Sequence, residues 1–153
     1  MAKFIRSVDA YAHPITTSTE NLLSPIYASM DFLQPHLYSA NLIAAARTFA
    51  PRRGDDMRPV FYGEFGDDHL RVTAEVKKSG LVEPPAVWAS LMGAGSLPAQ
   101  VWEGWKLRDT GRLTEIGAVH RFVALSGWAR HRDLQPFSAA MEGEARVPLT
   151  LTG

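Results

Sequence analysis

Apolar and polar residues alternate in short segments along this chain, and prolines and glycines separate the segments from one another. Short stretches rich in β-branched and aromatic residues predict strands at residues 13–18, 30–38, 59–65 and 98–102. Apolar residues at helical spacing predict helices at 2–8, 41–49, 84–92 and 113–125, the last with a buried stripe of Ile116, Val119, Phe122 and Val123. We expect a loop or short helix at 19–29, a polar turn at 51–57, and polar loops at 66–83 and 103–112. This alternation of strands and helices predicts an α/β fold with a parallel sheet.

Side chains alternate between the two faces of a strand, so the pattern also predicts which residues share a face. The predicted sets are Phe32, Gln34, His36 and Tyr38 on the second strand, Val60, Tyr62 and Glu64 on the third, and Gln100 and Trp102 on the fourth. In each set the groups suited to chemistry or binding come last, and parallel strands place their functional groups at that end. We therefore expect these three strand ends to bring a histidine, a tyrosine, a glutamate and a tryptophan to one edge of the sheet.

Each of these residues also has a plainer interpretation. Glu64, beside Gly63, fits a solvated glutamate at a strand exit, and His36 alone fits a structural histidine. Taken together, the strand ends favour a site for a sugar. A carboxylate can attack an anomeric carbon or stabilise an oxocarbenium-like transition state, and an indole face packs against a pyranose ring. Tyr38 and His36 can hydrogen-bond the carboxylate and hold it ionised.

Composition narrows the classes of function. The chain has 153 residues, 46% of them apolar, with 16 basic and 16 acidic side chains, which indicates one folded domain and gives no sign of a nucleic-acid partner. No apolar stretch reaches membrane-spanning length, and the first residues lack the apolar core of a signal peptide. Cysteine is absent, and the histidines have no compact metal-ligand spacing, so we expect neither a metal nor another cofactor. We interpret residues 67–69 as a solvated loop.

Six stretches together resemble the C-terminal half of a cellulase-type glycoside hydrolase. They are residues 9–18 (DAYAHPITTS), 31–39 (DFLQPHLYS), 59–66 (PVFYGEFG), 87–95 (VWASLMGAG), 99–105 (AQVWEGW) and 119–128 (VHRFVALSGW). The family is glycoside hydrolase family 5 of clan A, whose members are retaining (β/α)8 barrels. The resemblance covers roughly residues 3–137.

The resemblance implies a fold and a set of roles. Residues 1–137 would be the C-terminal half of a TIM (β/α)8 barrel, with about four parallel strands equivalent to strands five to eight, and 138–153 would begin a further segment. Glu64 would be the catalytic nucleophile, supported by His36 and Tyr38. Trp102 would form the floor of a sugar subsite, and Trp105 would be either a second platform or a rim residue. Phe32, Val60 and Val101 would point into the barrel interior.

The chain departs from the family at the general acid/base, which is a glutamate following an asparagine at the end of strand four. No Asn-Glu pair occurs in this sequence, and Glu103, at the correct edge, has no support from the family as a substitute. We therefore expect a carbohydrate substrate but little turnover by this chain alone. We also expect pairing with a missing N-terminal half-barrel or self-association, and, from the resemblance, a secreted or periplasmic location.

Two alternatives stay open at this point. One is a non-catalytic carbohydrate-binding or scaffold module built on the same half-barrel. The other is an unrelated α/β domain of flavodoxin-like wiring, which a glycine-rich phosphate loop after the first strand would support; residues 13–21 contain no glycine.

Overall fold

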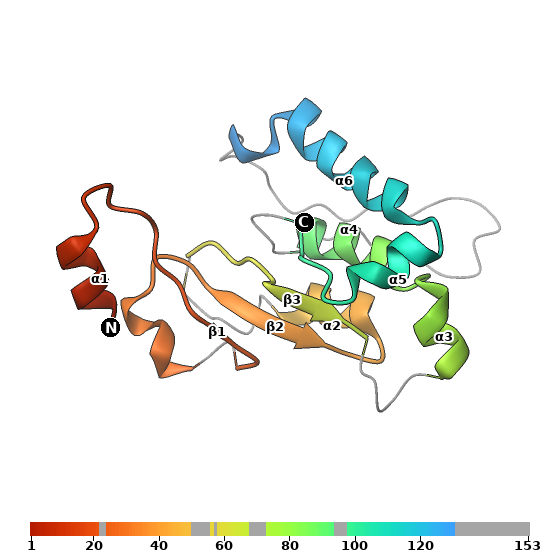
Figure 1. Cartoon of the computed structure of the whole chain (residues 1–153), viewed down its shortest axis with the longest axis horizontal. Helices are drawn as coiled ribbons and strands as arrows, with labels where there is room; N and C mark the ends of the chain where they lie inside the picture. Colours follow the sequence, from red (N-terminus) through yellow and green to blue (C-terminus); the bar gives the residue numbers. More distant parts are fainter. Residues whose placement is uncertain (22–23, 50–55, 57, 68–72, 94–97, 131–153) are drawn as a thin grey trace.

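A small parallel β-sheet lies in the middle of the molecule (Figure 1). The computed structural model describes residues 1–21, 24–49, 56, 58–67, 73–93 and 98–130. Three strands follow one another in the order β1 (Ser18–Thr19), β2 (Gln34–Tyr38) and β3 (Glu64–Gly66), and both pairings are parallel. Val101 adds a parallel bridge to Phe65 on the far side of β3. The predicted α/β class is thereby confirmed in its coarse form, whereas the half-barrel stays a prediction.

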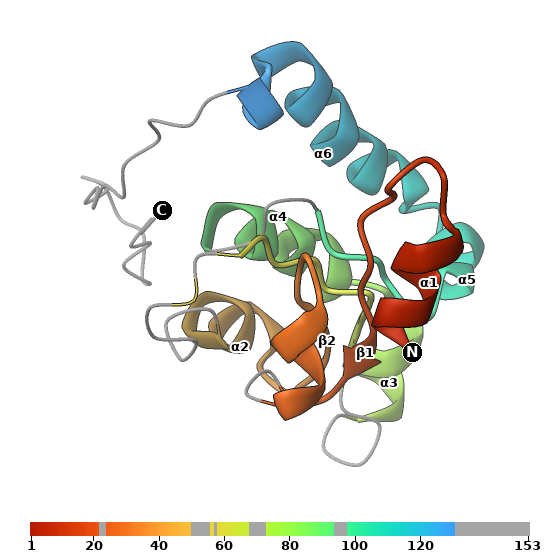
Figure 2. The ribbon, with the colours of Figure 1, turned by 90° about the vertical axis from the view of Figure 1, so that its left-hand side faces the viewer.

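The helices surround this sheet. Their bounds are α1 (Ala2–Val8), the 3-10 helix η1 (Pro25–Ser29), α2 (Leu42–Phe49), α3 (Ala74–Ser79), α4 (Glu83–Gly93), α5 (Gly104–Asp109), α6 (Leu113–Ser126) and the 3-10 helix η3 (Trp128–Arg130). Figure 2 shows α2 and α4 together on one side of the strands, with α6 beyond α4. The four longer predicted helices are confirmed to within a few residues.

The main core lies between the sheet and the pair α2 and α4. Its fully buried members include Leu33, Val60, Tyr62 and Phe65 from the strand segments, Leu42 and Ala46 from α2, and Ala86 and Val87 from α4. The predicted stripe of α6 is confirmed: Val119 is fully buried, and the other three residues are partly buried against the core. Val60 therefore packs beneath the helices and does not line an open interior, which corrects the expectation taken from the resemblance.

Three local predictions were wrong. Of the first predicted strand only its last residue, Ser18, joins a ladder, although the segment before it already runs beside the residues that lead into β2. There, the carbonyl of Ile15 accepts from the N–H of Asp31. Helices α3 and α5 lie in segments predicted as polar loops. The helix-forming residues of α3 and the burial of Leu107 in α5 explain why these segments are helical.

Some predictions fall on residues that the structure does not describe. The tail 138–153 and most of the turn 51–57 are among them. The predicted division into two segments at residue 137 therefore stays a prediction.

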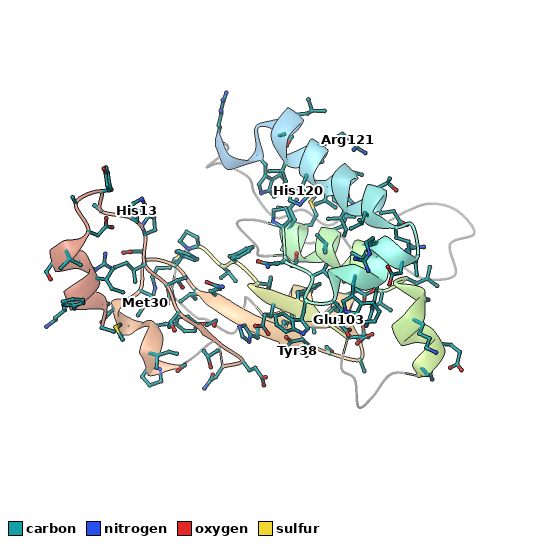
Figure 3. The ribbon with its side chains drawn as sticks, in the orientation of Figure 1. His13, Met30, Tyr38, Glu103, His120 and Arg121 are labelled. Atoms are coloured by element: carbon teal, nitrogen blue, oxygen red, sulfur yellow. The ribbon has the colours of Figure 1, made fainter. Side chains whose placement is uncertain are left out.

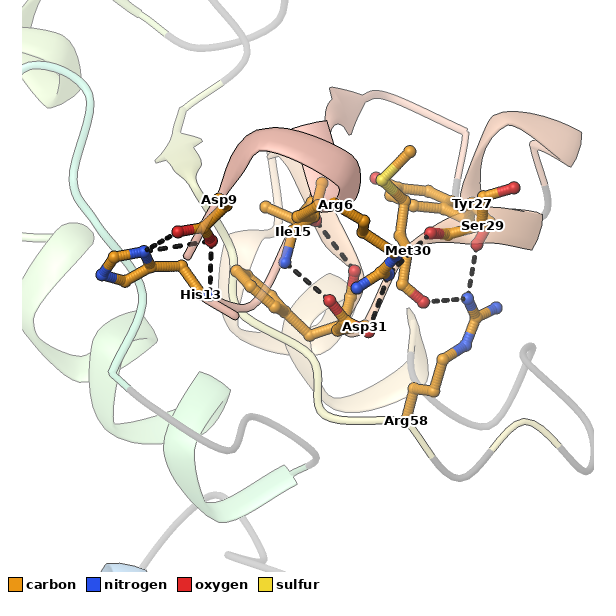
Figure 4. A network of polar contacts seen from close by, with 11 residues as sticks. Arg6, Asp9, His13, Ile15, Tyr27, Ser29, Met30, Asp31 and Arg58 are labelled. Atoms are coloured by element: carbon orange, nitrogen blue, oxygen red, sulfur yellow. Dashed lines mark hydrogen bonds and ion pairs between the residues drawn. The ribbon is translucent and has the colours of Figure 1, made fainter. Parts of the chain in front are cut away.

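A polar network joins the N-terminal segment to the residues that lead into β2 (Figure 4). The Asp31 carboxylate accepts from the Ile15 N–H at 2.7 Å and from Arg6 Nη2 at 2.9 Å. Arg58 Nη1 donates to the carbonyl groups of Tyr27 and Met30. These contacts give side-chain partners to backbone groups of Ile15, Tyr27 and Met30, which lie outside the named strands.

Candidate functional site

The strand that carries Glu64 contains one extra residue relative to its neighbour β2. Leu33 pairs with Val60, and His36 pairs with Glu64, so three steps along β2 correspond to four steps along the other strand. This is a β-bulge, in which two residues, Gly63 and Glu64, stand opposite one.

The segment 100–102, which pairs with the other edge of the Glu64 strand, shows the same extra residue. The N–H of Gln100 donates to the carbonyl of Tyr62, and the N–H of Trp102 donates to the carbonyl of Phe65. Two steps on one segment thus correspond to three on its partner. The extra residue therefore belongs to the strand that carries Glu64, because the pairing with each of its two neighbouring strand segments is offset by one residue.

The bulge decides which side chains face the core. Tyr62 and Phe65 are both fully buried, with ring centroids 5.6 Å apart, and the Tyr62 hydroxyl donates to the Ala46 carbonyl of α2 at 3.2 Å. Glu64 lies on the opposite, half-exposed face. The prediction that Val60, Tyr62 and Glu64 share a face is therefore wrong, because the alternation is reset between Tyr62 and Glu64. On β2 the predicted alternation is confirmed, since Pro35 and Leu37 are buried, whereas Gln34, His36 and Tyr38 are half-buried.

Glu64 is held by the two side chains expected to support it. The Tyr38 hydroxyl donates to Glu64 Oε2 at 2.5 Å, and His36 Nδ1 lies 3.3 Å from the same oxygen. The side chains of His36 and Glu64 are 19% and 27% exposed, so the carboxylate is sheltered but still open to a ligand. Their meeting follows from the register, because His36 stands directly opposite Glu64 and Tyr38 opposite Gly66.

Electrostatics keep the roles in this hydrogen bond fixed. Burial, the hydrogen bond to Glu64 and the charge of that carboxylate raise the pKa of the Tyr38 phenol. The charges of Glu20 and Glu103 act in the same direction. Tyr38 therefore stays protonated, and a hydrogen-bond donor, across the ordinary pH range.

Trp102 lies at the same edge of the sheet, and Trp105 follows it in α5. The register continues from Tyr38 through Gly66 to Trp102, and a Cβ at Gly66 would meet only the Tyr38 ring, at 3.6 Å, among the described atoms. Trp102 is 58% exposed and Trp105, in α5, is 53% exposed. Both indoles are thus accessible to solvent, the register places Trp102 beside the site, and neither is a core residue.

No family model, curated protein or solved structure matches this chain. Among the described residues, no group of three or more histidine, aspartate or glutamate side chains is placed to hold a metal ion. No helix among them is long and apolar enough to cross a membrane. The site therefore has to be interpreted from its own geometry.

A second polar cluster lies beside the site and was not predicted. Lys106, in α5, is 3% exposed, and its Nζ lies 3.1 Å from Asp67 Oδ2 and 3.7 Å from Glu83 Oε1. It also contacts Glu103 Oε2. Asp67 is 1% exposed, so the prediction that it belongs to a solvated loop was wrong.

The charges of this cluster are unequal, with three carboxylates around one ammonium. Burial raises the pKa of Glu83, and the neighbouring carboxylates add to that rise while Lys106 opposes it. Burial alone would lower the pKa of Lys106, but its hydrogen bonds to Glu103 and Asp67 outweigh burial and raise it. The sequence carried no sign of this arrangement, because a glutamate three residues before a lysine is typical of an exposed pair on a helix surface. Glu103 and Tyr38 both lie near the carboxyl ends of the strands (Figure 3).

Proposed function

We propose that this chain carries the nucleophile side of a retaining, cellulase-like glycoside hydrolase site, with Glu64 as the nucleophile. The observation that carries the proposal is the short hydrogen bond from the Tyr38 hydroxyl to Glu64 Oε2, with His36 Nδ1 against the same oxygen. A carboxylate fixed in this way presents Oε1 toward a ligand on the open face. The likeness of the six sequence stretches to family 5 of clan A supports the same assignment.

In this mechanism Glu64 Oε1 forms a bond to the anomeric carbon while the bond from that carbon to the leaving oxygen breaks. Tyr38 and His36 hold the carboxylate in one orientation, which lowers the entropic cost of reaching the attacking geometry. Trp102 and Trp105 offer apolar faces to sugar rings. Water then hydrolyses the glycosyl ester, and the substrate is a β-linked glycan.

The leaving oxygen also needs a proton, and the described residues offer no suited donor at the expected position. The sequence has no Asn-Glu pair, and the Glu103 carboxylate is engaged by Lys106. We propose that the acid comes from a separate N-terminal half-barrel that covers the open face. The half-exposed face of β2 and β3, and the absence of a described strand outside β1, support such a partner.

A fluorinated active-site trap tests the nucleophile directly. We would incubate the chain with 2,4-dinitrophenyl 2-deoxy-2-fluoro-β-glucoside and with the corresponding mannoside. Dinitrophenolate leaves without protonation, so the first step does not need the acid. We expect the mass of one fluoroglycosyl group on the peptide containing Glu64, and none in Glu64→Gln. Glu75→Gln, an exposed glutamate on α3, is the matched control and should label like the wild type.

A non-catalytic carbohydrate-binding module is the second candidate, favoured by the engagement of Glu103 with Lys106. It predicts that β-linked oligosaccharides bind and that binding weakens in Trp102→Ala, while the trap leaves no covalent label. Binding without labelling would replace the first proposal with the second. Absence of both labelling and binding would end the carbohydrate assignment.

A further inference from the structure

Gly63 occupies the extra position of the bulge, directly beneath the side chain of Gln34. A Cβ built on Gly63 would lie 2.3 Å from Gln34 Nε2, 2.6 Å from Cγ and 2.8 Å from Cδ. Gly63 is not among the glycines with positive φ, so its backbone does not require glycine. The requirement is one of space: the Gln34 side chain fills the volume where a side chain of residue 63 would stand.

The register shift shows what this space is used for. Before the bulge the Tyr62 side chain faces α2, and regular alternation from there would turn residue 64 toward the same core. A carboxylate would then be buried among apolar groups, and Phe65 would face the open side. The extra residue reverses both, so that Phe65 is fully buried and Glu64 meets Tyr38 and His36.

We infer that Gly63 and Gln34 together form the positioning device for Glu64: the bare glycine leaves the space that the Gln34 side chain fills, and a Cβ at residue 63 would displace the bulge that turns the carboxylate to the open face. Gly63 is a positioning residue, since it acts through Glu64. As a statement about the nucleophile the inference rests on the proposed function, but its geometry can be tested without any sugar.

The test uses the Tyr38 hydrogen bond as a local probe. The chemical shift of the Tyr38 ring carbon that bears the hydroxyl, assigned with Tyr38→Phe, would be measured by NMR with ¹³C-labelled tyrosine. The difference between wild type and Glu64→Gln defines the full effect of losing the carboxylate. We expect Gly63→Ala to move this resonance at least halfway to its Glu64→Gln position. Gly104→Ala is the matched control, because a Cβ at Gly104 meets nothing within 4 Å.

Two further variants separate positioning from general damage. Gln34→Ala removes the atoms that a Cβ at residue 63 would strike, so Gln34→Ala/Gly63→Ala should return the Tyr38 resonance to its wild-type position. Gly63→Ala should add no further shift in the Glu64→Gln background, because its effect passes through Glu64. If Gly63→Ala does not fold alone, the rescued double variant still reports on the same contact.

Several results would overturn the inference. A folded Gly63→Ala with an unchanged Tyr38 resonance would do so. So would a shift of equal size when Gly63→Ala is added to Glu64→Gln, or a Tyr38 resonance in Gln34→Ala/Gly63→Ala that does not return to its wild-type position. The proposed function is tested separately by the trap. A confirmed Gly63 effect with no labelling of the wild type would refute the glycosidase and support the positioning device. Labelling of the wild type without a Gly63 effect would support the glycosidase and refute the positioning device.

Discussion

Replacing Lys106 with methionine removes the ammonium around which three carboxylates are buried, and it keeps a side chain of similar length. Nζ lies 3.1 Å from the Asp67 carboxylate, and both side chains are almost fully buried. With an effective dielectric constant of about 20, Coulomb's law gives about 5 kcal/mol of attraction for unit charges at that separation. In the variant the carboxylates stay buried without their partner, so we expect a loss of about 3–5 kcal/mol in the free energy of unfolding at pH 7.

The loss should also depend on pH, and its sign follows from Glu83. Burial raises the pKa of this carboxyl above its ordinary value of 4.5, while Lys106 opposes the rise. A carboxyl whose pKa is higher in the folded state binds more protons when folded. The free energy of unfolding therefore falls as the pH rises from the unfolded-state pKa through the folded-state pKa. Without Lys106 the pKa of Glu83 rises further, so the variant should be penalised less at pH 5 than at pH 7.

Urea unfolding followed by tryptophan fluorescence at both pH values measures this. Lys78→Met, an exposed lysine on α3, is the matched control. Adding Glu83→Gln to Lys106→Met should recover part of the lost stability, since it removes one of the unpaired charges. The reasoning would be refuted if Lys106→Met came within about 1 kcal/mol of Lys78→Met at pH 7, or if its cost were the same at pH 5.

Three further substitutions test the open face and the core face of the sheet independently. Tyr38→Phe should slow labelling of Glu64 by the trap by about 10- to 100-fold, because a hydrogen bond to a charged group contributes about 1.5–3 kcal/mol; an unchanged labelling rate would contradict the role of Tyr38. Tyr62→Phe should cost about 0.5–1.5 kcal/mol in urea unfolding, since it removes the buried donor to Ala46, and should leave labelling unchanged. Trp102→Ala should weaken oligosaccharide binding, measured by calorimetry, by about tenfold without loss of stability, because the indole is exposed and a tenfold change corresponds to about 1.4 kcal/mol.

The parts of the fold that the sequence predicted are those set by local periodicity. The stripe of α6 repeats at helical spacing around Val119, and β2 alternates regularly from Leu33 to Tyr38. Both patterns are long enough to be independent of the rest of the chain. The meeting of His36, Tyr38 and Glu64 was also predicted correctly, because parallel strands bring their carboxyl ends to one edge.

The parts that the sequence did not predict depend on contacts between segments far apart in the chain. Strict alternation placed Tyr62 and Glu64 on one face, and only pairing with both neighbouring strands reveals the extra residue at Gly63. Lys106 and Asp67 carry the charges of surface residues, and their burial follows from how α5 docks beside the end of β3. In each case a tertiary contact overrides the local pattern.

The bulge at Gly63 links the site to the buried cluster, because it sets the direction of every later side chain on the strand. With the extra residue, Glu64 faces the open side and Asp67 turns inward, where Lys106 contacts it. Without it, both carboxylates would exchange faces. Gly63→Ala should therefore reduce the cost of Lys106→Met, since Asp67 would no longer depend on the ammonium. We expect a coupling of about 1–2 kcal/mol in a double-mutant cycle measured by urea unfolding. Additive costs would mean that the register shift and the cluster are maintained independently.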